Sequence, residues 1–430
     1  MEFVSKAKKW NVEVFGNPFA KKRRILARLQ GAQKALANNP NEFLLELEQQ
    51  LISNYSLVLL QEEEYWALKS RLNTATFGDH NTSFFHVSTI VRRHRNKIRC
   101  LKDTEGNWLT KEVEIKEYIR NSYKKLYMTE LNVSSMTSYV SEFSCCFLEE
   151  EDKARIDGGV TEEEIRASLW ALKPFKAPGP DGLHAGFYQH FWLVVKNSIC
   201  NEVKGIFDKG CVLSYLNETW ISLIPKCQNP EALSNYRPIS LCNSVYKIVT
   251  KTLVAQIRPL LNRLISPVQI AFDPGRRGTD NVLIAQKLFH ALDKKKGKMG
   301  FMAVKLDLEK AYDRLEWSFI YRVLQAFHFP PKITKIIISC ITSINTSILV
   351  NGGALECFEP SRGIRQGDPL SPYIFILCME YLGHLIEQKC VNGDWVPLKA
   401  SKDNLCFSHL LFADDIILSA KLMRVGVKQF

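Results

Sequence analysis

No stretch of this sequence is apolar for long enough to cross a lipid bilayer. The most apolar stretches, Ile336–Val350 and Leu370–Ile386, are too short or too polar, since a membrane-spanning helix needs about 20 apolar residues. The first ten residues, MEFVSKAKKW, also lack the apolar region of a secretory signal peptide. We therefore expect an intracellular protein without a membrane partner, in the nucleus or the cytoplasm.

The sequence also lacks the cysteine and histidine spacings of a zinc site. Its twelve cysteines are scattered, apart from the adjacent pair Cys145–Cys146, and no Cys-x-x-Cys pair occurs. This pattern predicts reduced thiols rather than a metal-binding motif. Acidic residues are comparatively few, with 45 Asp and Glu against 57 Lys and Arg and a net charge of +12. Such a balance suits a polyanionic partner, although basic proteins without one are common.

Residues 1–155 are expected to form a mainly helical, basic region. Apolar residues recur every three or four positions from Leu44 to Val58, which predicts one face of a long helix that pairs with another. The Lys21–Arg24 run is a helix surface or a nuclear import signal. A basic cluster follows, which is a solvated helix face or a nucleic-acid contact. It includes Arg92, Arg93, Arg95 and Lys97.

Residues 156–430 alternate between helical and strand patterns, which favours α/β or α+β layering. KAPGPDG at 176–182 is typical of a loop, 219–226 of a strand, and 243–261 of a helix.

Two adjacent carboxylates stand inside the apolar stretch LFADDIILSA, at Asp414 and Asp415. Burying unpaired charge is costly, so something must compensate them. Residues 301–308 alternate as a strand that ends near Asp307. Two strands that deliver carboxylates to one point would make an oxygen-rich site suited to Mg²⁺, and two such ions can assist phosphoryl transfer.

The segment SRGIRQGDPLSP lies between these strands. We expect Gly363 and Gly367 to let the backbone approach a ligand closely. Arg365 and Gln366 carry donors suited to a phosphate or a base.

A helix should follow, with Ser371 as its N-cap and Pro372 in its first position. Asp313 and Asp368 also lie near the expected site. We interpret Asp313 as a helix residue and Asp368 as a turn or cap.

Several motifs together resemble the reverse transcriptase of non-LTR (LINE-type) retrotransposons, particularly those of plants. The resemblance covers most of the chain from about residue 60. It rests, in order, on GDHNTSFFHVSTIVRRHRNKIRCLKDTEGNW (78–108), KAPGPDGLHAGFYQHFW (176–192), SNYRPISLCNSVYKI (234–248), AFDPGRRGTDN (271–281), VKLDLEKAYDRLEW (304–317), RGIRQGDPLSP (362–372) and LFADD (411–415).

The resemblance implies a fold and a set of roles. The fold would be α+β, with right-hand polymerase fingers and palm at 156–430 after a helical linker region at 1–155. Asp307, Asp414 and Asp415 would be the catalytic acids that hold two Mg²⁺ ions.

Other residues would bind the nucleotide. The ring of Tyr312 would block a ribose 2′-OH and so select deoxynucleotides; a buried helix aromatic is the alternative. Gln366 and Gly367 would lie against the nucleotide and template, and Arg237 would neutralise the triphosphate.

The implied function is RNA-directed DNA polymerisation, from an RNA template, a DNA primer and dNTPs. The family's endonuclease and thumb are not recognisable, so we expect a truncated copy. A catalytically inactive remnant that only binds nucleic acid is the main alternative, and an intron maturase ranks last. No motif distinguishes an active polymerase from a remnant that only binds nucleic acid.

Overall fold

The computed structural model describes residues 2–70, 82–131, 147–271, 276, 278–294, 300–399 and 406–421. Cys145–Cys146 and parts of two resembling segments, 78–81 and 272–275, lie outside these ranges. Every cysteine whose side chain is described is a free thiol, as expected. Among the described helices, none combines the length and the apolar character needed to cross a bilayer.

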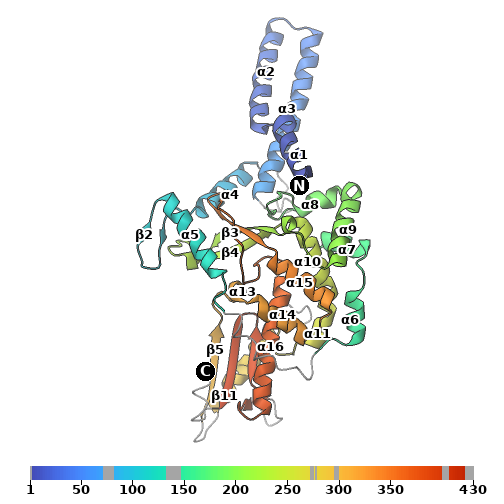
Figure 1. Ribbon diagram of the computed structural model, residues 1–430. Coiled ribbons are helices and arrows are strands. Elements are labelled where there is room, and N and C mark those ends of the chain that lie inside the picture. Colours follow the sequence, from blue (N-terminus) through green and yellow to red (C-terminus); the bar gives the residue numbers. More distant parts are fainter. Residues whose placement is uncertain are drawn as a thin grey trace.

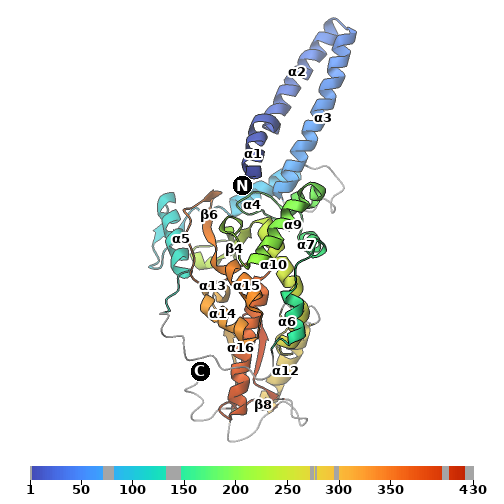
Figure 2. The same cartoon turned by 45° about the vertical axis from the view of Figure 1, so that its right-hand side comes forward.

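The N-terminal helices form an arm that projects from the rest of the molecule (Figures 1 and 2). It comprises α1 (Glu2–Trp10), a π-helical turn (Asn11–Phe15), α2 (Pro18–Asn38) and α3 (Glu42–Ser70). Helices α2 and α3 run antiparallel, and Leu51 and Val58 of α3 are buried. Lys22 of α2 pairs with Glu62 of α3 at 2.6 Å. The predicted long, paired helix is therefore confirmed.

Helix α5 packs on a mixed sheet in the body of the molecule. The preceding elements are α4 (Thr82–Arg95), β1 (Leu101–Lys102) and β2 (Trp108–Leu109), and α5 spans Glu112–Leu126. Ile119 and Tyr123 of α5 share a hydrophobic cluster with Ile221 and Ile348 of the sheet. The predicted domain boundary at residue 155 stays a prediction. The packing of α5 on the sheet joins residues from both sides of that boundary.

That sheet has the order β4-β3-β6-β7. Its strands are β3 (Glu218–Pro225), β4 (Tyr236–Cys242), β6 (Asn345–Val350) and β7 (Gly353–Ala354). Strand β3 pairs antiparallel with β4 and parallel with β6. Burial alternates along most of β3, as expected where one sheet face is covered. The strand predicted at 219–226 is confirmed.

A second sheet has the order β10-β11-β5 and is antiparallel throughout. Its strands are β5 (Phe301–Asp307), β10 (His409–Phe412) and β11 (Asp415–Lys421). Ile416 and Leu418 of β11 belong to the main hydrophobic core, together with Phe375 of α16 (Ser371–Val391). Helix α16 lies alongside this sheet (Figure 1).

The remaining elements complete an α+β fold, as predicted. They are α6 (Glu150–Asp157), α7 (Glu162–Trp170), α8 (Ala185–His190), α9 (Trp192–Lys209), α10 (Ser244–Ile257), α11 (Leu261–Leu264), α12 (Gly278–Lys294), α13 (Ala311–Arg314), α14 (Trp317–Ala326), α15 (Pro331–Thr342), β8 (Leu398–Lys399) and β9 (Cys406–Phe407). The helix expected over 243–261 ends early, at Ile257. A tighter turn with Pro259 follows, because proline cannot donate the next helical hydrogen bond.

Gly363 holds a close approach between the segment before α16 and the residues after β5. Its φ is +91°, and an added Cβ would lie 2.7 Å from the Asp313 carbonyl oxygen. The expected approach to a ligand is thus wrong for Gly363, which meets the protein's own backbone. Gly367 also lies close to the protein's own backbone, since its added Cβ would lie 3.1 Å from the Ser240 carbonyl oxygen, and its approach to a ligand stays a prediction.

We expect Gly363→Ala to destabilise the protein by roughly 2–4 kcal/mol, through backbone strain and the collision with Asp313. Gly352→Ala is the matched control, because Gly352 has the same φ but open space around its Cβ position. It should cost only about 1–2 kcal/mol. Urea unfolding measures both, and equal losses would contradict the collision.

Candidate active site

Three acidic residues lie at one end of the β10-β11-β5 sheet. Asp415 opens β11 and pairs directly with Asp307, the last residue of β5. Asp414 lies in the two-residue turn between β10 and β11, beside Ala413. Its carbonyl oxygen accepts a hydrogen bond from the Leu308 N–H at 3.5 Å. The hairpin and its neighbour thus bring together the three acids that the sequence singled out.

The turn itself is tight. Ala413 has a φ of +53°, which a short hairpin needs but which only glycine adopts without cost. Two-residue turns hold their strands in one register, so the turn controls where both acids lie.

A lysine partly compensates this negative charge. Lys305 lies two residues before Asp307 on β5, and its Nζ is 2.9 Å from Asp415 Oδ1. The hydrogen bond and charge of Asp415, with smaller contributions from Asp307 and Asp414, raise the pKa of the Lys305 ammonium. The pair is too exposed to add much stability. It does show that the sheet end attracts a cation.

The donor set suits a hard divalent cation, because carboxylate oxygens are the ligands that Mg²⁺ prefers. The contact between Lys305 and Asp415 places one positive group among the acids already. Within the described ranges, however, no three Asp, Glu, His or Cys side chains are arranged as a ready-made metal site. The residues therefore fit such an ion by chemistry and position, without being pre-assembled around it.

A cavity of about 420 Å³ opens beside these acids. Its walls include Asp414 and four residues singled out from the sequence as nucleotide-binding: Arg237, Tyr312, Gln366 and Gly367. Asp307 and Asp415 are not among its lining residues. Five of the seven expected catalytic and nucleotide-binding residues thus share one cavity, although they come from four separate segments of the chain.

The cavity also holds positive residues that sequence reasoning missed. Lys226 follows β3 and Lys310 precedes α13, and both line the cavity together with Arg237. Three cationic side chains around one concave space attract an anion. Lys310 lies within the VKLDLEKAYDRLEW segment, but nothing local marks either lysine as a cavity residue, since each reaches the cavity only through the fold.

The Tyr312 ring packs against α16. It stacks on Phe375 of α16, with ring centroids 4.6 Å apart and an interplanar angle of 14°. Burial, and then the charge of Asp414, raise the pKa of its hydroxyl, which stays protonated. The ring therefore presents a wall to the cavity.

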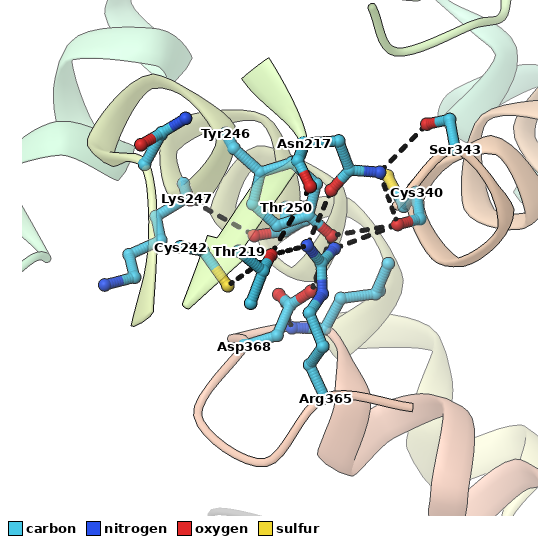
Figure 3. A network of polar contacts seen from close by, with 12 residues as sticks. Asn217, Thr219, Cys242, Tyr246, Lys247, Thr250, Cys340, Ser343, Arg365 and Asp368 are labelled. Atoms are coloured by element: carbon cyan, nitrogen blue, oxygen red, sulfur yellow. Dashed lines mark hydrogen bonds and ion pairs between the residues drawn. The ribbon is translucent and has the colours of Figure 1, made fainter. Parts of the chain in front are cut away.

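Arg365 does not face a ligand, contrary to expectation. Its guanidinium is buried among β3, α10 and α15, as Figure 3 shows. It donates to Asn217 Oδ1 at 2.6 Å, Thr219 Oγ1 at 2.9 Å and the Cys340 carbonyl oxygen at 2.9 Å. It also stacks over the Tyr246 ring at 4.1 Å.

Asp368 balances the Arg365 charge, at 3.2 Å, and accepts a hydrogen bond from the Tyr246 hydroxyl at 2.5 Å. Its other oxygen accepts from the Leu370 N–H at 3.1 Å, just before α16. Asp368 thus forms a turn before α16, which was one of the two expected options, and it is not a side-chain cap of that helix. Ser371 is instead the first residue of α16 and makes no cap, so that prediction is wrong.

Asp313 is a buried acid that touches Gln366. It is only 2% exposed and accepts from the Tyr127 hydroxyl at 3.0 Å and from Gln366 Nε2 at 3.3 and 3.2 Å. Burial raises the pKa of Asp313 to about 6, although these hydrogen bonds and the nearby Lys310 and Lys226 oppose the shift. Our interpretation of Asp313 as an ordinary helix residue missed this.

The residues of the N-terminal basic cluster differ in their contacts. Arg92 donates to the carbonyl oxygens of Lys69 and Ser70, so it ties α4 to the end of α3. Arg93, Arg95 and Lys97 are exposed. Their role in nucleic-acid binding stays a prediction.

Residues 224–428 match the family model described as reverse transcriptase (RNA-dependent DNA polymerase). An uncharacterized 149 kDa protein of transposon TX1 from Xenopus laevis is 27% identical over 354 residues, covering 82% of this chain and 26% of that protein.

Two Drosophila relatives show a comparable likeness. The Pol polyprotein of the retrotransposable element R2DM from Drosophila melanogaster is 26% identical, over 79% of this chain and 30% of that protein. The RNA-directed DNA polymerase from mobile element jockey of Drosophila funebris is 22% identical, over 85% and 38%. The chain therefore spans about a quarter to two fifths of the length of these curated relatives.

The Arg365 network yields a stability prediction. Arg365→Met should destabilise the protein by about 3–5 kcal/mol, because it leaves Asp368 buried without its cation. The double variant Arg365→Met/Asp368→Asn should recover part of that loss, since no buried charge remains. Chemical unfolding of the single and double variants measures this coupling, and strictly additive losses would refute it.

Asp313 yields a pH prediction. Its folded pKa lies above the unfolded value of 3.8, so the fold favours the protonated acid. Stability from this group is present below about pH 4 and is lost as the pH rises through about 6. At pH 7 Asp313→Asn should therefore be more stable than the wild type, by roughly 2–3 kcal/mol. Unfolding at pH 4 and pH 7 tests this, and a variant less stable at both would contradict it.

Proposed function

We propose that residues 224–428 are a reverse transcriptase domain of the non-LTR retrotransposon type and that the chain copies RNA into DNA from a primer, using dNTPs. The observation that carries this proposal is the cavity shared by Asp414, Arg237, Tyr312 and Gln366. Its size suits a nucleotide, and its walls supply cations, a flat ring and an acid in one place.

We further propose a right-hand arrangement of these elements. The β10-β11-β5 sheet with α16 would be the palm, because it carries the three acids. The β4-β3-β6-β7 sheet would belong to the fingers, because it contributes Arg237 from its edge strand. The nucleotide would then lie between the two sheets.

Each wall of the cavity has a distinct task in this proposal. Lys226, Arg237 and Lys310 would neutralise the triphosphate, since cations in a partly closed space hold phosphate strongly. Tyr312 would lie against the sugar and exclude a 2′-OH. Gln366 and Gly367 would face the nucleotide and the template base.

Asp307, Asp414 and Asp415 would hold two Mg²⁺ ions, which would supply charge stabilisation. The primer 3′-OH would attack the α-phosphate as the bond to the β-phosphate breaks and pyrophosphate leaves. Lys305 would release Asp415 when the ions bind. The template would be RNA and the primer DNA, and the exposed Arg93, Arg95 and Lys97 would add contacts to the nucleic-acid backbone.

A second candidate function is nucleic-acid binding without synthesis. The contact of Lys305 with Asp415 favours it, because this ion pair competes with a metal for the carboxylate. Binding alone would need the basic surface but none of the three acids.

Primer extension separates the two candidates. With an RNA template, a DNA primer, dNTPs and Mg²⁺, the wild type should extend the primer, and Asp414→Asn should lose at least about a hundredfold in rate. Asp394→Asn is the control, because Asp394 is an acid paired with Lys389 and does not line the cavity. RNA binding by all three proteins without any extension would favour the binding function instead.

Tyr312 can be tested by sugar selection. Tyr312→Val should lower the preference for dNTP over rNTP in kcat/KM by roughly tenfold or more, since it opens space for a 2′-OH. Tyr312→Phe keeps the ring and should keep the preference. If both variants select sugars like the wild type, Tyr312 is a packing residue only.

A further inference from the structure

Gln366 lines the cavity with an amide whose orientation is dictated by its neighbour. Both contacts of Gln366 Nε2 go to the carboxylate of Asp313, at 3.3 and 3.2 Å. An ionised carboxylate accepts hydrogen bonds and donates none, so the end of the amide that faces it must be the NH₂. Gln366 Oε1 is then the group that the side chain can offer to a ligand.

Asp313 is itself held by a residue from the N-terminal part of the chain. The hydroxyl of Tyr127, directly after α5, donates to Asp313 Oδ1 at 3.0 Å. Burial, and then the charge of Asp313, raise the pKa of Tyr127, so this hydroxyl stays a donor. The backbone of the same segment is tied as well, because the Ser361 N–H donates to the Tyr127 carbonyl oxygen at 2.8 Å.

The backbone of Gln366 is fixed independently of its side chain. Its carbonyl oxygen accepts from the Ser240 N–H at 2.8 Å, and Arg365 next to it is buried in the network of Figure 3. The main chain therefore needs no help from Asp313. What Asp313 adds is the direction in which the amide points.

We propose that Asp313, supported by Tyr127, is a positioning residue that makes Gln366 present a hydrogen-bond acceptor, and so selects a nucleotide sugar that carries a hydroxyl donor. This inference rests on the proposed polymerase function. The hydroxyl belongs either to the 3′ position of the incoming nucleotide or to the 2′ position of the RNA template. Both sources supply the same donor to the same oxygen.

If Asp313 served only the fold, an ionised acid would be unfavourable there. A neutral amide of the same shape satisfies the same neighbours at a lower desolvation cost. In Asp313→Asn, the new side chain can donate as well as accept, so Gln366 is free to turn its NH₂ toward the cavity. Asp313→Asn should thus remain folded and lose the preference for a sugar that carries the hydroxyl.

The experiment compares wild type, Asp313→Asn and Tyr127→Phe in two arms. One arm measures kcat/KM for a dNTP against the matching 2′,3′-dideoxynucleotide, and the other for an RNA against a DNA template. Asp313→Asn should lower one of these two ratios about three- to tenfold, chiefly through KM, with no loss of thermal stability at pH 7. Tyr127→Phe should move the same ratio in the same direction. The arm that responds identifies the hydroxyl.

Asp152→Asn is the matched control, because Asp152 is another buried acid, paired with Arg263 at 2.8 Å, and does not line the cavity. It should leave both ratios unchanged. If Asp313→Asn leaves both ratios at the wild-type value while the wild type extends primers, the inference is overturned and the polymerase function stands.

If the wild type does not extend primers, the proposed synthesis fails, and binding in Ca²⁺ still tests Asp313 without turnover. The dNTP-to-dideoxynucleotide and RNA-to-DNA binding ratios should then shift as above in Asp313→Asn. Unchanged or unmeasurable binding would overturn the inference as well.

Discussion

Strand β5 pairs with β11 in a register that sets Asp307 opposite Asp415, and the candidate site depends on that pairing. Side chains alternate between the two faces of a strand, so a slip by one residue would send Asp307 to the opposite face from Asp415. The two-residue turn at Ala413 and the burial of Ile416 and Leu418 both act against such a slip. The apolar residues around the acids thus have a positional task in addition to building the core.

Two sites of buried charge hold the chain in place near the candidate site. Arg365 and Asp368 form an ion pair inside the body, and Asp313 lies buried beside Gln366. Each costs solvation energy that apolar residues would not. In return, these groups fix the orientation of the segments that they contact, because hydrogen bonds fix angles and apolar contacts do not. The Gln366–Gly367 segment is consequently held from two sides by groups that a purely stable fold would not need.

Local patterns in the sequence were enough to find the acids but not the groups that support them. The alternation over 301–308 and the apolar hairpin around Asp414 indicated strands, and both strands are present. Asp313 showed only a helical context, since its partners Tyr127 and Gln366 lie 186 and 53 residues away. Burial of Arg365 likewise depends on β3, α10 and α15. Contacts between distant segments leave no period for a sequence to display.

The packing of α5 also bears on how the chain can be divided. Helix α5 contributes Tyr123 and Leu126 to the cavity wall, and its apolar face closes one side of the β3 sheet. A fragment that began at residue 156 would retain all the acids, yet it would expose Ile221 and Ile348 to water and lose Tyr127 as partner of Asp313. The smallest piece that folds as a unit should therefore begin upstream of Ile98, where this cluster starts.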